Sequence, residues 1–232
     1  TFASLKLITI IAVIYHQLSN NMKIKQATYT NLTFVVVITM VLLISTSAFA
    51  SADAAKNKVK AVFGQIEASL VTLKQTQRLT KVNIRAVLTE YLLPEVETRY
   101  FTYKVLNKNL TKVPEALRES FVTELSLQLI NTYSSLLNKY NNEQLYIGQS
   151  SLSPSGKMAM VDITIVGKTK SNKALVKLMQ SNANDWLFFD IEVEGISLLQ
   201  TKQGEINASF NRLGVDGTLL HLKNINQRVI EE

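Results

Sequence analysis

The stretch from Glu90 to Tyr140 reads EYLLPEVETRYFTYKVLNKNLTKVPEALRESFVTELSLQLINTYSSLLNKY, and it decides the fold of this 232-residue chain. Large apolar side chains recur in it at the three- and four-residue spacing of amphipathic helices. They are more numerous than a domain of this size needs to bury, and residues typical of catalysis are almost absent. This surplus predicts that part of the apolar surface lines a cavity for an apolar ligand.

Two prolines divide the helices of this stretch. Pro94 follows a helical stripe over 84–92, and Pro114 precedes a longer stripe over 117–140. Proline suits the first turn of a helix and disfavours helical geometry in the residue before it. We therefore expect new helices to begin at Pro94 and Pro114, with Asn107 ending the first of them in a left-handed conformation.

After Asn141 the apolar period changes from helical spacing to alternation. Short polar turns separate four alternating segments, which is typical of antiparallel hairpins. The predicted strands are Leu145–Ile147, Met158–Val166, Ala174–Gln180 and Trp186–Val193. In the last of them, Leu187, Phe189, Ile191 and Val193 are expected to share one face.

Apolar residues at helical spacing also precede the Glu90–Tyr140 stretch and follow the predicted strands. Residues 58–79 carry a helical stripe, and residues 196–211 and 219–230 carry two more, separated by a turn over 214–217. We therefore predict an α+β fold: N-terminal helices, then a curved antiparallel sheet of about four strands, then C-terminal helices, with an apolar cavity between helices and sheet. Gly195 is expected to end the sheet.

The first fifty residues have the pattern of an export signal. Met22–Lys25 is basic, Leu32–Ile44 is mainly apolar, and Ala48–Ala50 forms a small-residue cleavage site. The alternative is an uncleaved membrane anchor, because the 19 residues of Leu32–Ala50 could just span a bilayer. Both interpretations place the rest of the chain outside the cytoplasmic membrane.

The domain boundaries follow from this pattern. Residues 1–21 are expected to be an upstream over-extension of the reading frame, and residues 22–50 a signal peptide that is cleaved after Ala50. Residues 51–232 are expected to form a single binding domain.

Composition excludes several classes of function. The absence of Cys excludes a disulfide framework, thiolate metal sites and Cys nucleophiles. The formal net charge is +7, but Lys6, Lys23 and Lys25 lie in the first fifty residues. Without these three, the 25 basic residues become 22 against 18 acidic ones, a net charge of +4. Such a mild excess is weak evidence for nucleic acid, which we do not expect as a partner.

No pattern indicates catalysis, a metal or a cofactor. The single His of the predicted domain, His221, is expected on a helix surface, and no nucleophile–base pair accompanies it. The acidic residues Asp190, Glu192 and Glu194 alternate along a strand, which indicates an ion-paired or solvated face rather than a metal site. The residues alone therefore predict an exported, non-catalytic binding domain.

Two blocks of residues carry a family resemblance. The first block comprises Leu92-Leu93-Pro94, Tyr100, Val105-Leu106, Phe121, Thr132-Tyr133 and Tyr140. The second comprises Trp186, Asp190, Glu194-Gly195-Ile196-Ser197-Leu198, Lys202-Gln203, Gly214-Val215-Asp216-Gly217 and Leu222. From Val59 to Gln227, their order and spacing resemble the periplasmic phospholipid-binding component of the Mla (maintenance of lipid asymmetry) transport system, also called the toluene-tolerance family. The chain departs from the family pattern at helix ends, at Asn107, Leu110 and Val113.

The resemblance implies a carrier in the periplasm of a Gram-negative bacterium. Such a carrier moves glycerophospholipids between an outer-membrane lipoprotein complex and an inner-membrane ABC transporter complex, and so maintains outer-membrane lipid asymmetry. The acyl chains of the lipid enter a cavity between the helices and the sheet of the carrier, and the lipid head group stays near solvent. Two acyl chains hold about 30 methylenes, whose exposure to water costs over ~20 kcal/mol, so a carrier must supply apolar surface.

The candidate walls of the cavity come from helices and strands alike. They are Val105, Tyr133, Leu137, Val161, Ile163, Phe189, Ile191 and Val193. Periodicity does not separate apolar residues that face a cavity from those that face a filled core. An exported interaction or adaptor domain with a filled core is therefore the alternative, and an exported hydrolase is disfavoured by the missing nucleophile–base pair.

Overall fold

A computed structural model describes residues 52–231 of the chain. The predicted over-extension, signal peptide and cleavage site lie outside the described residues. Over 52–231, none of the helices combines the length and the apolar character that crossing a bilayer requires.

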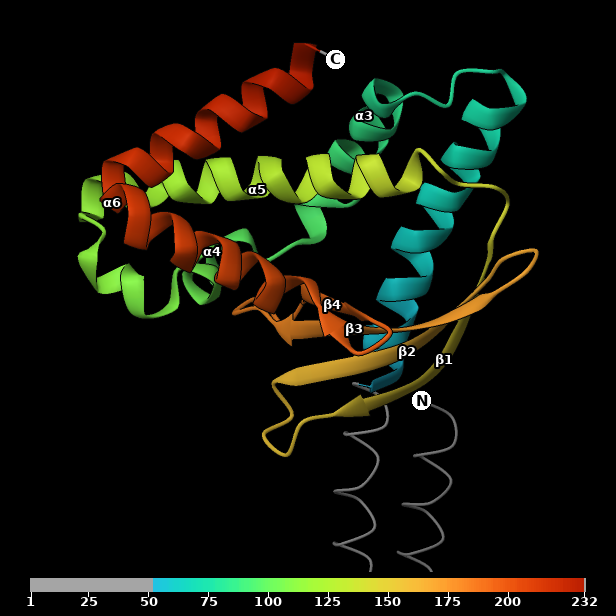
Figure 1. Ribbon diagram of the computed structural model, residues 1–232. Coiled ribbons are helices and arrows are strands. Elements are labelled where there is room, and N and C mark those ends of the chain that lie inside the picture. Colours follow the sequence, from blue (N-terminus) through green and yellow to red (C-terminus); the bar gives the residue numbers. More distant parts are fainter. Residues whose placement is uncertain (1–51, 232) are drawn as a thin grey trace, which may run out of the picture. The chain divides into compact units, whose positions relative to one another are not determined.

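The described chain opens with two helices. The first covers residues 52–75, drawn blue to teal in Figure 1, and α3 covers Lys81–Tyr91. Thr80 caps α3, because its hydroxyl accepts a hydrogen bond from the Asn83 amide at 3.3 Å. Both helices follow the predicted apolar stripes.

The helix expected at Pro94 begins later. Leu93–Glu95 forms only a short 3-10 turn, and α4 covers Thr98–Leu106. Between them Val96 is extended and forms a parallel bridge with Phe188 in the sheet. The prediction was wrong here because pairing with a strand, a contact distant in sequence, takes this residue out of the helix. Asn107 has the positive φ expected of it, 46°, and a 3-10 segment over Asn107–Lys112 follows.

The long helix α5 covers Glu115–Leu137 and begins directly after Pro114, as predicted. It ends three residues before Tyr140, which lies in the connection to the sheet. In Figure 1, α5 crosses above the sheet, and the chain that leaves it descends beside the end of the 52–75 helix. A hydrogen bond of 2.9 Å from the Lys74 ammonium to the Asn141 side chain joins these two segments.

The sheet is antiparallel and its strands follow chain order, which confirms the predicted α+β architecture. Its strands are β1 (Gln144–Leu152), β2 (Met158–Val166), β3 (Ser171–Gln180), β4 (Trp186–Val193) and β5 (Ile196–Ser197). The fifth strand continues the sheet beyond Gly195, where we expected it to end. Its two residues fold back on the end of β4 through a tight turn at Glu194 and Gly195.

A bulge in β4 changes which of its residues share a face. Phe188 pairs with Leu178, and Asp190 pairs with the preceding residue Lys177, so Phe189 is an extra residue without a partner on β3. Phe188 before the bulge and Ile191 after it therefore lie on the same face of the sheet. The expectation that Leu187 shares a face with Ile191 and Val193 was wrong, because strict alternation assumes a strand without a bulge.

The last helix, α6, covers Leu198–Glu231 and contains one kink. Gly214 has φ 68° and ψ −167°, a conformation that is almost restricted to glycine. We expected two helices separated by a turn over 214–217. The break is narrower, since only Gly214 leaves helical geometry and the chain is helical again from Val215.

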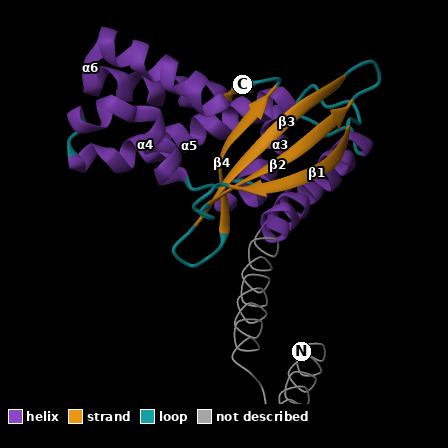
Figure 2. Cartoon of the chain, turned by 90° about the horizontal axis from the view of Figure 1, so that it is seen from below, coloured by secondary structure: helices purple, strands orange, loops and turns teal. Residues whose placement is uncertain are grey.

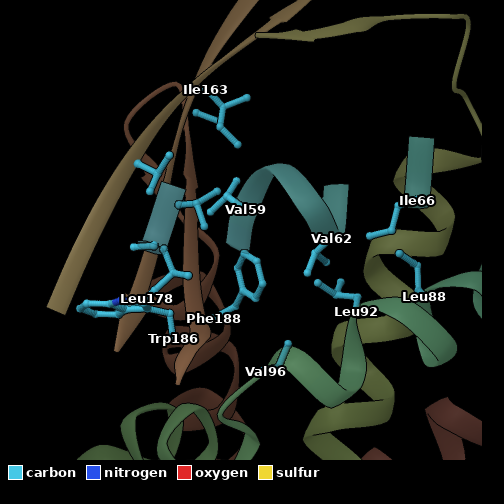
Figure 3. Close-up of a cluster of buried hydrophobic side chains, with 14 of the residues drawn as sticks. Val59, Val62, Ile66, Leu88, Leu92, Val96, Ile163, Leu178, Trp186 and Phe188 are labelled. Carbon is cyan, nitrogen blue, oxygen red and sulfur yellow. The ribbon is translucent and has the colours of Figure 1, made fainter. Parts of the chain in front are cut away.

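The helices of residues 52–231 pack on one face of the sheet, and none of them covers its other face (Figures 1 and 2). One apolar cluster joins the sheet, the 52–75 helix and α3. In Figure 3, Val59 lies toward the strands, near Ile163 and Leu178, and farther along the same helix Ile66 lies beside Leu88. A second cluster joins α4, α5 and α6. The two clusters form separate cores, and α5 contributes to both.

Candidate functional site

A cavity of about 740 Å³ lies between the helices and the inner face of the sheet. This volume is within the range of small-molecule sites, about 300–1,000 Å³. Its wall is almost wholly apolar and comes from the 52–75 helix, α3, α4, α5, the start of α6 and all five strands. An apolar cavity of this size is suited to an apolar guest, because water inside it would find few hydrogen-bond partners.

The helical side of the wall repeats at helical spacing. Leu129, Tyr133 and Leu137 lie four residues apart on α5, so their side chains project from one face toward the cavity. Phe63 and Ile66 of the 52–75 helix contribute in the same way, and the Phe63 ring stacks on Phe188 at 5.8 Å between centroids. Most of the wall therefore consists of side chains held by helices and strands.

The sheet side of the wall depends on the bulge in β4. Ile191 and Val193 pair with Val176 and Ala174, so all four lie on the inner face. Phe189, the extra residue, also reaches the cavity, and its ring meets Tyr100 edge to face at 5.2 Å between centroids. In a regular strand, adjacent residues point to opposite faces of the sheet. The bulge thus allows adjacent residues of β4 to line the same wall.

Asp190 joins the sheet to α6 at the cavity wall. Its carboxylate is only 4% exposed, and its Oδ2 accepts hydrogen bonds from the Ser197 hydroxyl at 2.8 Å and the Lys177 ammonium at 3.2 Å. Its Oδ1 accepts from the Leu199 amide at 3.1 Å, so the carboxylate caps the first turn of α6. Leu198 and Leu199, which line the cavity, are thereby held against β4.

Lys177 and Tyr133 respond to this buried charge. Burial alone would lower the pKa of Lys177, but hydrogen bonds and charge from Glu192 and Asp190 outweigh it and raise that pKa above its usual value. Burial, and then the charge of Asp190, raises the pKa of the Tyr133 hydroxyl well above its usual value. Tyr133 therefore stays neutral at ordinary pH and adds no charge to the wall.

The cavity reaches the surface between the end of α5 and the turn before β5. Leu136 and Ile196 line it and are 58% and 62% exposed, which is unusual for large apolar side chains. Lys139, Glu143 and Glu194 also line this part. The opening therefore has an apolar rim with charged groups close by.

Comparisons with known proteins place the chain in a family. A model of the MlaC protein family matches residues 63–224.

The chain belongs to the MlaC family.

Its fold is similar to that of a phospholipid-binding protein from Ralstonia solanacearum, whose structure was solved in complex with a phospholipid. The TM-score is 0.67 at 16% sequence identity, and the match covers 76% of this chain and 98% of that one. At this identity the likeness concerns the fold. The matched segment runs from Phe63 in the 52–75 helix to Asn224 in α6 and so includes every element of the cavity wall.

Five of the eight residues predicted as walls in this MlaC-family chain lie along the cavity. They are Tyr133, Leu137, Phe189, Ile191 and Val193. The other three, Val105, Val161 and Ile163, lie in filled core instead. Val105 packs among α4, α5 and α6, and the 52–75 helix covers the inner face of β2 at Val161 and Ile163. Ile165, two residues further along β2, does line the cavity.

Sequence reasoning missed most of the wall from the first helices. Phe63, Ile66, Leu70, Leu88, Leu92, Val96 and Phe101 line the cavity, and none was among the predicted residues. They belong to the same stripes that build the core, so spacing carries no signal that distinguishes them. The family resemblance begins near Val59, and this start is the one signal that could have pointed to the 52–75 helix.

In the described part of this MlaC-family chain, the acidic and His side chains do not form a metal site. Over residues 52–231, no three His, Asp or Glu side chains lie close enough to hold a metal ion. His221 is exposed on α6, as expected. Asp190 and Glu192 share Lys177 as an ion-pair partner, at 3.2 and 3.1 Å, which agrees with the ion-paired interpretation of this acidic strand.

Proposed function

We propose that this chain is a phospholipid carrier of the periplasm, and that its function is binding and transport rather than catalysis. The observation that carries the proposal is the apolar cavity of about 740 Å³ between sheet and helices in a chain of the MlaC family. The phospholipid bound to the Ralstonia solanacearum protein of the same fold supports it. The candidate contacts for acyl chains are Tyr133, Leu137, Phe189, Ile191 and Val193, with the wall residues of the 52–75 helix and α3.

The carrier exchanges lipid with an outer-membrane lipoprotein complex and with an inner-membrane ABC transporter complex. A shuttle works best when a lipid is about as stable in the cavity as in a bilayer, because partners can then bias loading or release by small differences in affinity. An apolar wall without strong polar anchors suits that requirement. The same cavity speaks against an adaptor domain with a filled core.

Mass spectrometry of lipid extracted from the purified protein tests the proposal. We expect co-purified glycerophospholipid, and we expect lipid-free protein to take up labelled phospholipid from vesicles and deliver it to acceptor vesicles. Protein that carries no lipid after purification and takes none from vesicles would contradict the proposal. Val105→Ala, which alters filled core away from the cavity, controls for a general loss of stability.

A further inference from the structure

A second, polar pocket of about 360 Å³ adjoins the apolar cavity. The two share Glu67, Tyr140 and Glu143 in their walls, so the polar pocket begins where the apolar cavity ends. The remaining wall of the polar pocket comes from the end of the 52–75 helix and the connection to β1: Val71, Lys74, Gln75, Asn142 and Gln144. An apolar compartment continued by a polar one matches the two parts of an amphiphile.

The polar pocket contains both signs of charge. Its charged side chains are the carboxylates Glu67 and Glu143 and the ammonium of Lys74. Lys74 lies over the Tyr140 ring, 5.7 Å from the centroid, and donates to Asn141 at 2.9 Å. These contacts fix Lys74 beside the shared wall.

The two carboxylates of the pocket both lie close enough to Tyr140 to act on its hydroxyl. Glu143 accepts a hydrogen bond from the Asn141 amide at 2.7 Å, which holds it in the connection after α5. Burial, and then the charges of Glu67 and Glu143, raises the pKa of the Tyr140 hydroxyl, so both carboxylates act on the same group. The wall of the pocket therefore carries one cation and two anions.

We infer that this pocket is a head-group site that favours a zwitterionic phospholipid with an ammonium group over an anionic one. The inference rests on the proposed function. Lys74 attracts the phosphate that all such lipids share, and Glu67 and Glu143 attract the ammonium of an ethanolamine head group. A glycerol head group offers no cation, so its lipid brings only the phosphate charge to a pocket with an excess of carboxylates.

A competition experiment tests the preference. Lipid-free protein is incubated with vesicles that contain phosphatidylethanolamine and phosphatidylglycerol in equal amounts with identical acyl chains, and the bound lipids are quantified by mass spectrometry. We expect the bound ratio to exceed the vesicle ratio by about three- to tenfold, the effect of one or two partly exposed charge pairs.

Variants separate the two roles within the pocket. Glu67→Gln and Glu143→Gln together are expected to bring the bound ratio close to the vesicle ratio. Lys74→Gln is expected to lower the uptake of both lipids. Glu205→Gln on α6, an exposed carboxylate that lines neither pocket, is the matched control and should keep the wild-type ratio.

The outcomes distinguish this inference from the proposed function. Two results would overturn the head-group site without affecting the proposal of a lipid carrier. The first is wild-type protein that binds the two lipids at the vesicle ratio, and the second is a bound ratio that the two Glu→Gln changes do not alter. Protein that binds neither lipid from the vesicles contradicts the carrier function itself.

Discussion

Asp190 shows how one buried side chain can hold together two elements of a cavity wall. Its carboxylate accepts from Ser197, Leu199 and Lys177, and so ties β4 to the first turn of α6. Buried charges are stable only where such partners compensate for the loss of water. The alternation of acidic residues at 190, 192 and 194 predicted an ion-paired face, but nothing in it distinguished Asp190 as the buried member.

Removing this charge should weaken the fold. Asp190→Asn keeps the size of the side chain, but it loses the charge that holds Lys177 and places an amide donor where an acceptor is needed. Hydrogen bonds to charged groups contribute about 1.5–3 kcal/mol, so we expect the free energy of unfolding to fall by roughly 2 kcal/mol. Urea titration measures it, with Glu205→Gln as a control. A loss below about 0.5 kcal/mol would show that the carboxylate is not a structural tie.

Tyr133 gives a pH dependence with a defined sign. Its pKa is raised in the folded protein, so above about pH 10 the unfolded chain loses this proton while the folded chain keeps it. Ionisation of Tyr133 therefore leaves the free energy of unfolding unchanged below pH 9 and lowers it as the pH rises above 10. Between pH 9 and 11, lipid-free wild type should lose up to ~1.4 kcal/mol more than Tyr133→Phe.

The control for this comparison is Tyr146→Phe. Tyr146 is 56% exposed on β1, and its hydroxyl donates to the Gln144 side chain, so the change removes a hydroxyl without touching the cavity. Chemical denaturation at several pH values measures both variants. Parallel pH profiles for wild type and Tyr133→Phe would contradict the burial of this hydroxyl.

At the scale of elements, the sequence predicted the regular segments well. The limits of β2 and β4 agree with the alternation, and α5 begins after Pro114 as its ring geometry favours. Local chemistry decides such features, and local chemistry is what a sequence displays. The predicted order of helices, antiparallel sheet and helices follows from the same signals.

The errors arose where a distant contact decided the local structure. Val96 bridges Phe188 instead of starting a helix, and the bulge at Phe189 reverses the expected face of β4. Three of the eight predicted wall residues lie in filled core for the same reason. Val161 and Ile163 are covered by the 52–75 helix while Ile165 is not, and no periodicity can report which part of a face another element covers.

Two glycines of α6 should respond to alanine with opposite signs. Gly214 holds the kink at φ 68° and ψ −167°, so Gly214→Ala should cost about 1–3 kcal/mol in backbone strain. Gly204 lies in the helical part with open space around it, so Gly204→Ala should stabilise the protein by roughly 0.5–1 kcal/mol. Thermal unfolding of the two variants checks both signs. A stabilising Gly214→Ala would mean that α6 is straight in solution.

At the scale of the whole molecule, the sheet and the helices form two apolar cores, and the cavity is lined mainly by residues of the core that includes the sheet. One core joins the sheet to the 52–75 helix and α3, and the other joins α4, α5 and α6. The cavity wall thus consists largely of the same apolar side chains that pack in the core of the sheet, the 52–75 helix and α3. The surplus of apolar residues in the sequence therefore serves both the core and the cavity.

The occupation of that cavity can be measured directly with a phospholipid that carries a photoreactive diazirine at the end of one acyl chain. After loading, irradiation and digestion, mass spectrometry locates the labelled residues. The account predicts labels on wall residues such as Leu70, Leu137 and Ile191, and competition by unlabelled phospholipid should remove them. Labels confined to the open outer face of the sheet, around Tyr146, or labels that unlabelled phospholipid does not remove would contradict it.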